Sequence, residues 1–163
     1  MKNKLDTFIK NNLEKEINYG RFKAAKMGAS SINYEEVCCS DINSFINNNK
    51  NESKFQSLLF KYIDYRDLKD SDVYNKVHID RRLFSKIRND SDYHPSKDTV
   101  ILLGLSLKLS LDEMLDLLNS ASYSLPKNNY YDLIIRFCFM EGIYSIKDVN
   151  ELLDSYNCRL FSY

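Results

Sequence analysis

Glycine and proline are scarce in this chain, which has four glycines and two prolines among 163 residues. These two residue types make most tight turns and breaks in regular structure, so their scarcity leaves few of either. Hydrophobic residues make up 44% of the chain, with 12 tyrosines and 9 phenylalanines, which is enough to build a core. The composition therefore predicts an all-α fold.

An excess of charge is also missing, because 23 Lys and Arg residues balance 23 Asp and Glu residues. A protein that binds nucleic acid over its whole surface is normally basic, so any nucleic-acid contact must come from a local patch. No run of about eighteen apolar residues occurs, so we expect no membrane span. The first residues lead into no apolar segment typical of a signal peptide, so we expect a cytoplasmic protein.

The motifs of metal binding and catalysis are absent as well. The four cysteines form no Cys-x-x-Cys pair and there are only two histidines, which predicts neither a zinc site nor a disulfide framework. We find no glycine-rich phosphate loop, serine elbow or His-Glu-x-x-His motif. Carboxylates such as Asp64, Asp67 and Glu113 suit helix caps and solvated faces better than paired acid–base work. We therefore expect no enzyme, no metal and no cofactor.

The polar run at residues 47–53 is the best candidate for a linker. Before it, an amphipathic helix is expected over residues 4–17, with Leu5, Phe8 and Ile9 on one face. We predict that residues 1–50 form a helical extension and that residues 51–163 form the main domain.

From residue 53 onward, apolar residues recur at helical spacing and cap signals precede most of the helices. Residues 97–109 are apolar nearly all round, which predicts a buried central helix, and Gly104 there predicts a close helix crossing. We expect a helix from 53 to 68, followed by two short helices capped by Ser71 and Asp80 and a loop at 89–95. Ser96 is expected to cap the central helix, and Ser110 and Glu113 form a capping box for the next one. A helix over 129–141 should carry Cys138 in the core and stop at Gly142, and Ser145 should cap a last helix.

Residues 72–89 predict two short helices joined by a tight turn. Val73 and Val77 lie four residues apart on one face of the first helix, as Leu83 and Ile87 do on the second. A basic, exposed second helix held by a short first helix is the layout of a helix-turn-helix, whose second helix enters the DNA major groove. The outward positions of the second helix are Arg81, Arg82, Ser85, Lys86 and Arg88.

The order of these helices resembles the phage-repressor type of helix-turn-helix fold, of which the lambda repressor-like domain is the familiar example. More narrowly, the string Val-Tyr-Asn-Lys-Val-His-Ile-Asp-Arg-Arg-Leu-Phe-Ser-Lys-Ile-Arg at 73–88, with Tyr-His-Pro-Ser-Lys at 93–97, is similar to a bacterial helical module often appended to other domains, including macrodomains of Gram-positive bacteria. The resemblance covers residues 53–155. It implies a five-helix helix-turn-helix core with extra N-terminal and C-terminal helices.

Two residues depart from the general helix-turn-helix pattern. Tyr74 stands where the first helix usually has a small residue, and its ring must push the helices apart or swing to one side. His78 stands in the turn where Gly is favoured, and it adopts a positive φ there only at some cost.

The first functional hypothesis is a regulator that binds DNA through the basic helix at 80–89. Residues from Lys76 to Lys97 include six basic and three acidic side chains, a local positive excess. One such helix covers a small footprint, so this hypothesis includes a homodimer. In the expected docking, residues near the start of the helix reach base edges and later ones lie nearer phosphates. The predicted DNA-binding residues are Arg81, Arg82, Ser85, Lys86, Arg88 and Lys97.

The second hypothesis is a helical protein–protein interaction module, an adaptor or an inhibitor of phage or mobile-element origin, that does not bind DNA. Tyrosine is enriched at protein interfaces, and the chain has several tyrosines at candidate surface positions. These are Tyr62, Tyr65, Tyr93, Tyr130 and Tyr131.

Overall fold

The structure is a computed structural model that describes residues 2–13, 55–90 and 92–162. Every regular element in these ranges is an α-helix, which confirms the all-α prediction. The predicted linker, the boundary near residue 50 and the end of the first helix lie outside the described residues. After a helix over residues 2–13, the elements are α3 (Phe55–Tyr65), α4 (Asp70–Lys76), α5 (Arg81–Asn89), α6 (Lys97–Leu107), α7 (Leu111–Ser120), α8 (Tyr130–Glu141) and α9 (Ile146–Asp154).

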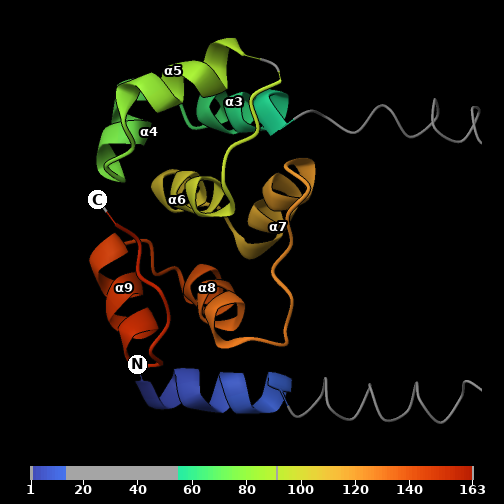
Figure 1. The fold of residues 1–163 in the computed structure, drawn as a ribbon, viewed down its shortest axis with the longest axis vertical. Coiled ribbons are helices and arrows are strands. Elements are labelled where there is room, and N and C mark those ends of the chain that lie inside the picture. Colours follow the sequence, from blue (N-terminus) through green and yellow to red (C-terminus); the bar gives the residue numbers. More distant parts are fainter. Residues whose placement is uncertain (1, 14–54, 91, 163) are drawn as a thin grey trace, which may run out of the picture.

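Helix α6 lies at the centre of the molecule, between α3, α4 and α5 on one side and α8 and α9 on the other (Figure 1). It packs against α4 and α7, and seven of its eleven residues are buried, which confirms the predicted central helix. At the crossing with α7, a Cβ atom added to Gly104 would overlap the sulfur of Met114. The predicted close approach at Gly104 is therefore confirmed, because any larger residue would displace the Met114 side chain.

Four predicted N-caps are confirmed. The side chains of Asp80, Ser96, Ser110 and Ser145 each accept a hydrogen bond from a backbone N–H in the first turn of the following helix. The Glu113 carboxylate also accepts from the Ser110 N–H at 2.8 Å, which completes the predicted capping box. Because a cap involves only residues within one turn of each other, it can be predicted from the local sequence alone.

The predicted cap at Ser71 is wrong. Helix α4 begins at Asp70, and the residue before it, Lys69, makes no capping bond with its side chain. The Ser71 hydroxyl instead donates to Asp72 Oδ1 at 3.4 Å. Asp70 and Asp72 both lie in the first turn, where their negative charge favours the exposed N–H groups, so α4 forms without a side-chain cap.

Two helices end slightly earlier than expected, and in both cases a residue with positive φ follows. Helix α3 ends at Tyr65, and Asp67 has a φ of 49°. Helix α6 ends at Leu107, and Lys108 has a φ of 51°. In a chain with so few glycines, other residue types take the left-handed conformation that reverses the chain after a helix.

The helix over residues 2–13 lies against α8 and α9, at the end of the molecule remote from α5 (Figure 1). Leu5 and Ile9 are buried in the common hydrophobic core. The ring of Phe8 lies 5.6 Å from that of Phe137, and Lys4 pairs with Glu141 at 2.6 Å. The described part of the N-terminal segment therefore does not cover α5.

The C-terminal tail packs back onto the fold. The side chain of Phe161 is buried, and its backbone N–H and carbonyl both bond to the amide of Asn150, at 2.9 and 3.0 Å. Arg159 donates to Asp98 at 2.7 Å and lies over the ring of Tyr131. The tail is thus fixed to α6, α8 and α9.

The most apolar helices, α6 and α8, are 11 and 12 residues long, which is far below the roughly 20 residues needed to span a bilayer. Among the described residues, no helix combines the length and the apolar character that a membrane crossing requires. Their apolar surface is buried in the core instead.

Candidate nucleic-acid interface

Helix α4 supports α5 and is itself fixed to the central helix. The hydroxyl of Ser106, on α6, is buried and donates to the Val73 carbonyl at 2.6 Å. Val73 on α4 and Phe84 and Ile87 on α5 are buried in the core. Helix α4 is therefore fixed to α6, and α5 packs its apolar face on α3 and α4, where the ring of Phe84 contacts those of Phe60 and Tyr74. The spacing of the apolar residues predicts these buried faces.

The turn between α4 and α5 accommodates both unusual residues. His78 has a φ of 55°, the conformation for which the helix-turn-helix pattern favours glycine. The Ile79 N–H donates to the Tyr74 carbonyl at 2.9 Å and closes the turn. The ring of Tyr74 is half-buried and tilted against that of Phe84, with 5.5 Å between ring centroids. The Tyr74 ring therefore packs against Phe84, which is the α5 side chain that faces the core.

The C-terminal end of α5 is held by α3. The amide of Gln56 donates to the carbonyl oxygens of Ile87 and Asp90, at 2.5 and 2.7 Å. These carbonyls belong to the last turn of the helix and the residue after it, which have no partner within the helix. A side chain 31 residues away closes this helix end, and no spacing in the sequence marks it.

Arg88 is engaged within the fold. Its guanidinium donates to Asp70 Oδ1 at 2.5 Å and lies 4.1 Å from the centre of the Phe60 ring. The pair joins the last turn of α5 to the first turn of α4, across 18 residues of sequence. In the sequence Arg88 is one of a row of equivalent cations, whereas in the structure it stabilises the contact between three helices.

Arg81, Arg82, Ser85 and Lys86 are all exposed along the outer face of α5, as predicted. Within the described part of the chain, the guanidinium groups of Arg81 and Arg82 have no acceptor. The other arginines of these ranges behave differently: Arg66 donates to Glu113, Arg88 to Asp70, Arg136 to the Leu125 carbonyl and Arg159 to Asp98. The two adjacent arginines at the start of α5 are thus left for solvent or a partner.

Lys97 lies away from that outer face, at the start of α6. Its ammonium group contacts Asp132 Oδ1 at 2.5 Å, and the Asp132 side chain is only 7% exposed. The Asn129 amide donates to the second oxygen of the same carboxylate at 2.8 Å. Lys97 therefore compensates a buried negative charge and fixes α8 to α6, so the interface considered below consists of α5 alone.

A hollow of about 600 Å³ lies between α3, α4 and α5, and no sequence pattern predicts it. Its lining combines apolar side chains with charges of both signs. The principal lining residues are Ile63, Leu68, Tyr74, Phe84, Asp64, Asp70, Arg81 and Arg88. The hollow adjoins the start of α5, where Arg81 belongs both to the outer face and to the rim.

The candidate surface tyrosines do not gather on one helix. Tyr65, at the end of α3, is 84% exposed, and Tyr130, at the start of α8, is 48% exposed. Tyr130 stacks on Tyr156 with 5.5 Å between ring centroids. The side chains of Tyr62, Tyr93 and Tyr131 are half-buried at the edge of the core.

Cys138 is buried in α8, as predicted, and burial raises the pKa of its thiol to about 12, so it stays protonated at neutral pH. In the described ranges, no group of three or more His, Cys, Asp or Glu side chains converges on a point that could hold a metal ion.

Comparison with known proteins identifies no relative: no protein-family model matches the chain, and no curated protein or solved structure matches it.

Proposed function

We propose that this protein is a non-enzymatic regulator with a phage-repressor-like helix-turn-helix domain, and that it binds DNA through α5. The observation that carries the proposal is the pair Arg81 and Arg82, exposed side by side and without an acceptor among the described residues. A planar guanidinium group matches the O6 and N7 atoms of guanine and also the oxygens of a phosphate.

The contacts that hold α5 in place support this proposal. Its inner face is buried, its first turn is capped by Asp80 and its last turn is held by Gln56. A helix fixed in this way presents its outer side chains without losing much further freedom on binding. Arg81, Arg82 and Ser85 occupy the N-terminal half of the helix, which reaches base edges in helix-turn-helix docking, and Lys86 lies next along the same face.

The charges of α4 limit how strongly the unit can bind. In helix-turn-helix docking the first helix crosses the DNA backbone, yet the first turn of α4 carries Asp70 and Asp72. Arg88 compensates Asp70, and Asp72 is exposed. Affinity must therefore come mainly from α5, and a two-fold dimer would double this small footprint.

The test is binding of the full chain to a random-sequence DNA duplex pool across a salt series. On such a pool both arginines are expected to contact phosphates, so Arg81→Ala with Arg82→Ala should flatten the slope of log K against log salt by about 1–2. Alanine is a good helix former, so α5 should persist. The matched control is Lys10→Ala with Lys127→Ala, which removes two positive charges from exposed positions on other elements.

The proposal fails if the unmodified chain does not bind the pool at low salt. It also fails if the Lys10/Lys127 variant loses as much of the slope as the Arg81/Arg82 variant, because binding would then depend on charge alone. Circular dichroism of both double variants checks that the helical content is unchanged.

The hollow between α3, α4 and α5 favours a second candidate function, a protein-interaction module that does not bind DNA. Its apolar base of Ile63, Tyr74 and Phe84, with Asp64 and Arg81 at the rim, suits an anchoring side chain of a protein partner better than a phosphate backbone. Failure to bind DNA at low salt would favour this candidate, as would competition for the hollow by a protein ligand.

A further inference from the structure

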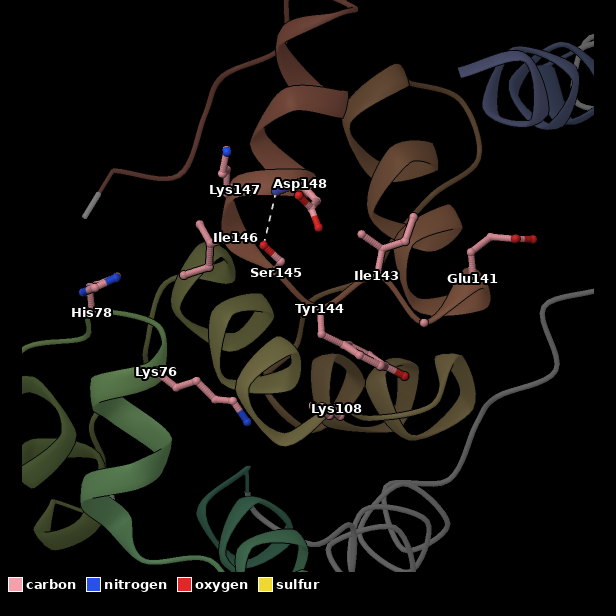
Figure 2. Close-up of a pocket in the computed structure, with 11 residues that line it drawn as sticks. Lys76, His78, Lys108, Glu141, Ile143, Tyr144, Ser145, Ile146, Lys147 and Asp148 are labelled. Atoms are coloured by element: carbon pink, nitrogen blue, oxygen red, sulfur yellow. Dashed lines mark hydrogen bonds between the residues drawn. The ribbon is translucent and has the colours of Figure 1, made fainter. Parts of the chain in front are cut away.

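A second and larger cavity lies on a different side of the helix-turn-helix unit. It has a volume of about 850 Å³ and lies between the C-terminal ends of α4 and α6 and the corner that joins α8 to α9 (Figure 2). Small-molecule sites typically have volumes of about 300–1,000 Å³. None of the residues discussed as the DNA-binding face of α5 lines this cavity.

Two lysines from different elements line it. Lys76 extends from α4 toward the end of α6, where Lys108 lies (Figure 2). The Lys76 ammonium donates to the Ser106 carbonyl over 3.3 Å, a long bond that leaves other N–H groups of the same ammonium available. Lys147 lies at the rim and points along α9. The cations available to the cavity thus come from two separate elements, α4 and the end of α6.

The acidic side chains of the lining do not cancel this charge. Glu141 points away from the centre of the cavity in Figure 2 and pairs with Lys4, which is outside the lining, at 2.6 Å. Asp148, near the start of α9, is the remaining carboxylate among the lining residues of the described chain. Lys147 pairs with Glu151 on its own helix at 4.0 Å, so Asp148 stands against Lys76 and Lys108 and leaves an excess of one positive charge inside a concave surface, where field lines concentrate.

The same cavity has an apolar side. Ile143 and Ile146 line it with side chains that are only 9% and 8% exposed, so they form a firm wall. Tyr144 presents its ring beside them, and its hydroxyl donates to the Leu109 carbonyl at 3.0 Å. Because this bond fixes the ring, a flat or apolar group can pack on it without first ordering the side chain.

We infer that this cavity binds a small organic molecule that carries a phosphate group. Lys76 and Lys108 would hold the phosphate, since an ammonium group is a compact charge with three donors. The organic part would lie on Ile146 and the ring of Tyr144. A volume well above that of a phosphate ion agrees with a ligand that has both parts. The inference does not rest on DNA binding.

The test is calorimetric titration of the full chain at constant ionic strength with three probes: phenyl phosphate, inorganic phosphate and phenol. Phenyl phosphate should bind most tightly, inorganic phosphate more weakly, and phenol not measurably. The variant Lys76→Gln with Lys108→Gln should weaken phenyl phosphate at least about tenfold, because two charge-assisted contacts are lost. Glutamine removes the charge at both positions and keeps a polar group that can donate hydrogen bonds.

Three further variants make the result specific. Lys10→Gln with Lys127→Gln removes the same charge elsewhere and should leave the affinity unchanged, and so should Arg81→Ala with Arg82→Ala. Lys108→Glu, at an exposed position, should abolish binding of phenyl phosphate with little effect on folding. The inference is overturned if phenyl phosphate gives no binding heat, if the Lys76/Lys108 variant binds it as well as the unmodified chain, or if the Arg81/Arg82 variant is the one that loses it.

Discussion

The first two arginines of α5 and the arginines of the C-terminal half occupy contrasting surroundings. Arg136 donates to the Leu125 carbonyl at 2.9 Å, and Arg159 binds Asp98 while lying over the ring of Tyr131. Arg81 and Arg82 find no such acceptor in the described residues, although they stand on a helix that is fixed at both ends. The engaged arginines connect elements of the fold, whereas Arg81 and Arg82 connect none of the described elements and are the two residues on which the proposed DNA contact depends.

The same contrast separates the lysines that the sequence groups together. Lys86 is exposed on α5, whereas Lys97 is paired with a nearly buried carboxylate. Arg88 resembles Lys97, since Asp70 and the ring of Phe60 hold it. A count of charges along the sequence treats all of these cations as equivalent, but the structure divides them into cations that stabilise helix contacts and cations that remain free to bind something else.

The largest effect should follow from breaking the Lys97–Asp132 pair. Asp132→Ala leaves the ammonium of Lys97 without its carboxylate in a partly buried position, and we expect the free energy of unfolding to fall by about 2–4 kcal/mol. Asp148→Ala is the matched control, because Asp148 occupies the same place in the first turn of α9 but is exposed. Urea denaturation of both variants measures the difference, and equal losses would show that Lys97 does not depend on Asp132.

The features that the sequence predicted are the local ones. The caps at Asp80, Ser96, Ser110 and Ser145 and the close approach at Gly104 depend on residues within one helix or on the absence of a side chain. Ser71 failed as a cap because two neighbouring aspartates provide the negative charge that a helix start needs.

The candidate site was harder to predict, because tertiary packing decides which cations are engaged. Asp70 and Arg88 are 18 residues apart, and Lys97 and Asp132 are 35 residues apart. Both separations far exceed the three or four residues at which side chains of one helix meet, so no local pattern could reveal these pairs. The exposure of Arg81 and Arg82 was predictable from the apolar stripe of α5, but their lack of an acceptor was not.

A smaller loss of stability is expected from breaking the pair of Arg66 with Glu113, since Arg66, like Arg159, binds a carboxylate of another element. Both nitrogen–oxygen contacts between Arg66 and Glu113 lie within 2.9 Å and join the end of α3 to α7. Burial alone would raise the pKa of Glu113, but hydrogen bonds from Ser110 and the Arg66 guanidinium outweigh it and lower that pKa. The stabilisation is therefore present above the pKa of the unfolded chain and is lost as the pH falls through the lower pKa of the folded chain.

Glu113→Gln tests this directly, because glutamine preserves the capping box but not the charge. We expect a loss of about 1 kcal/mol in the free energy of unfolding at pH 7. The loss should shrink as the pH falls through the lowered pKa of Glu113, where the carboxylate of the unmodified chain becomes protonated as well. Unfolding curves recorded between pH 3 and pH 7 give the profile, and a difference that stays constant with pH would contradict the charged pairing.

The smallest effect should come from releasing Arg88 from Asp70, so that it joins Arg81 and Arg82 as an arginine without an acceptor. Asp70→Ala removes the carboxylate that holds Arg88, so its guanidinium becomes available beside Lys86 on α5. If α5 contacts DNA, the slope of log K against log salt should steepen by about 0.9, the value for one more phosphate contact. Stability should fall by about 0.3–1 kcal/mol, because a negative charge is lost from the start of α4.

Asp72→Ala is the matched control for this change. It removes an equal charge from the same turn of α4 but leaves the Arg88–Asp70 pair intact. If both variants steepen the salt slope equally, the gain comes from lower local negative charge rather than from Arg88. If Asp70→Ala alone steepens it, Arg88 can act as Arg81 and Arg82 are proposed to act, and the pairing with Asp70 is what separates it from them.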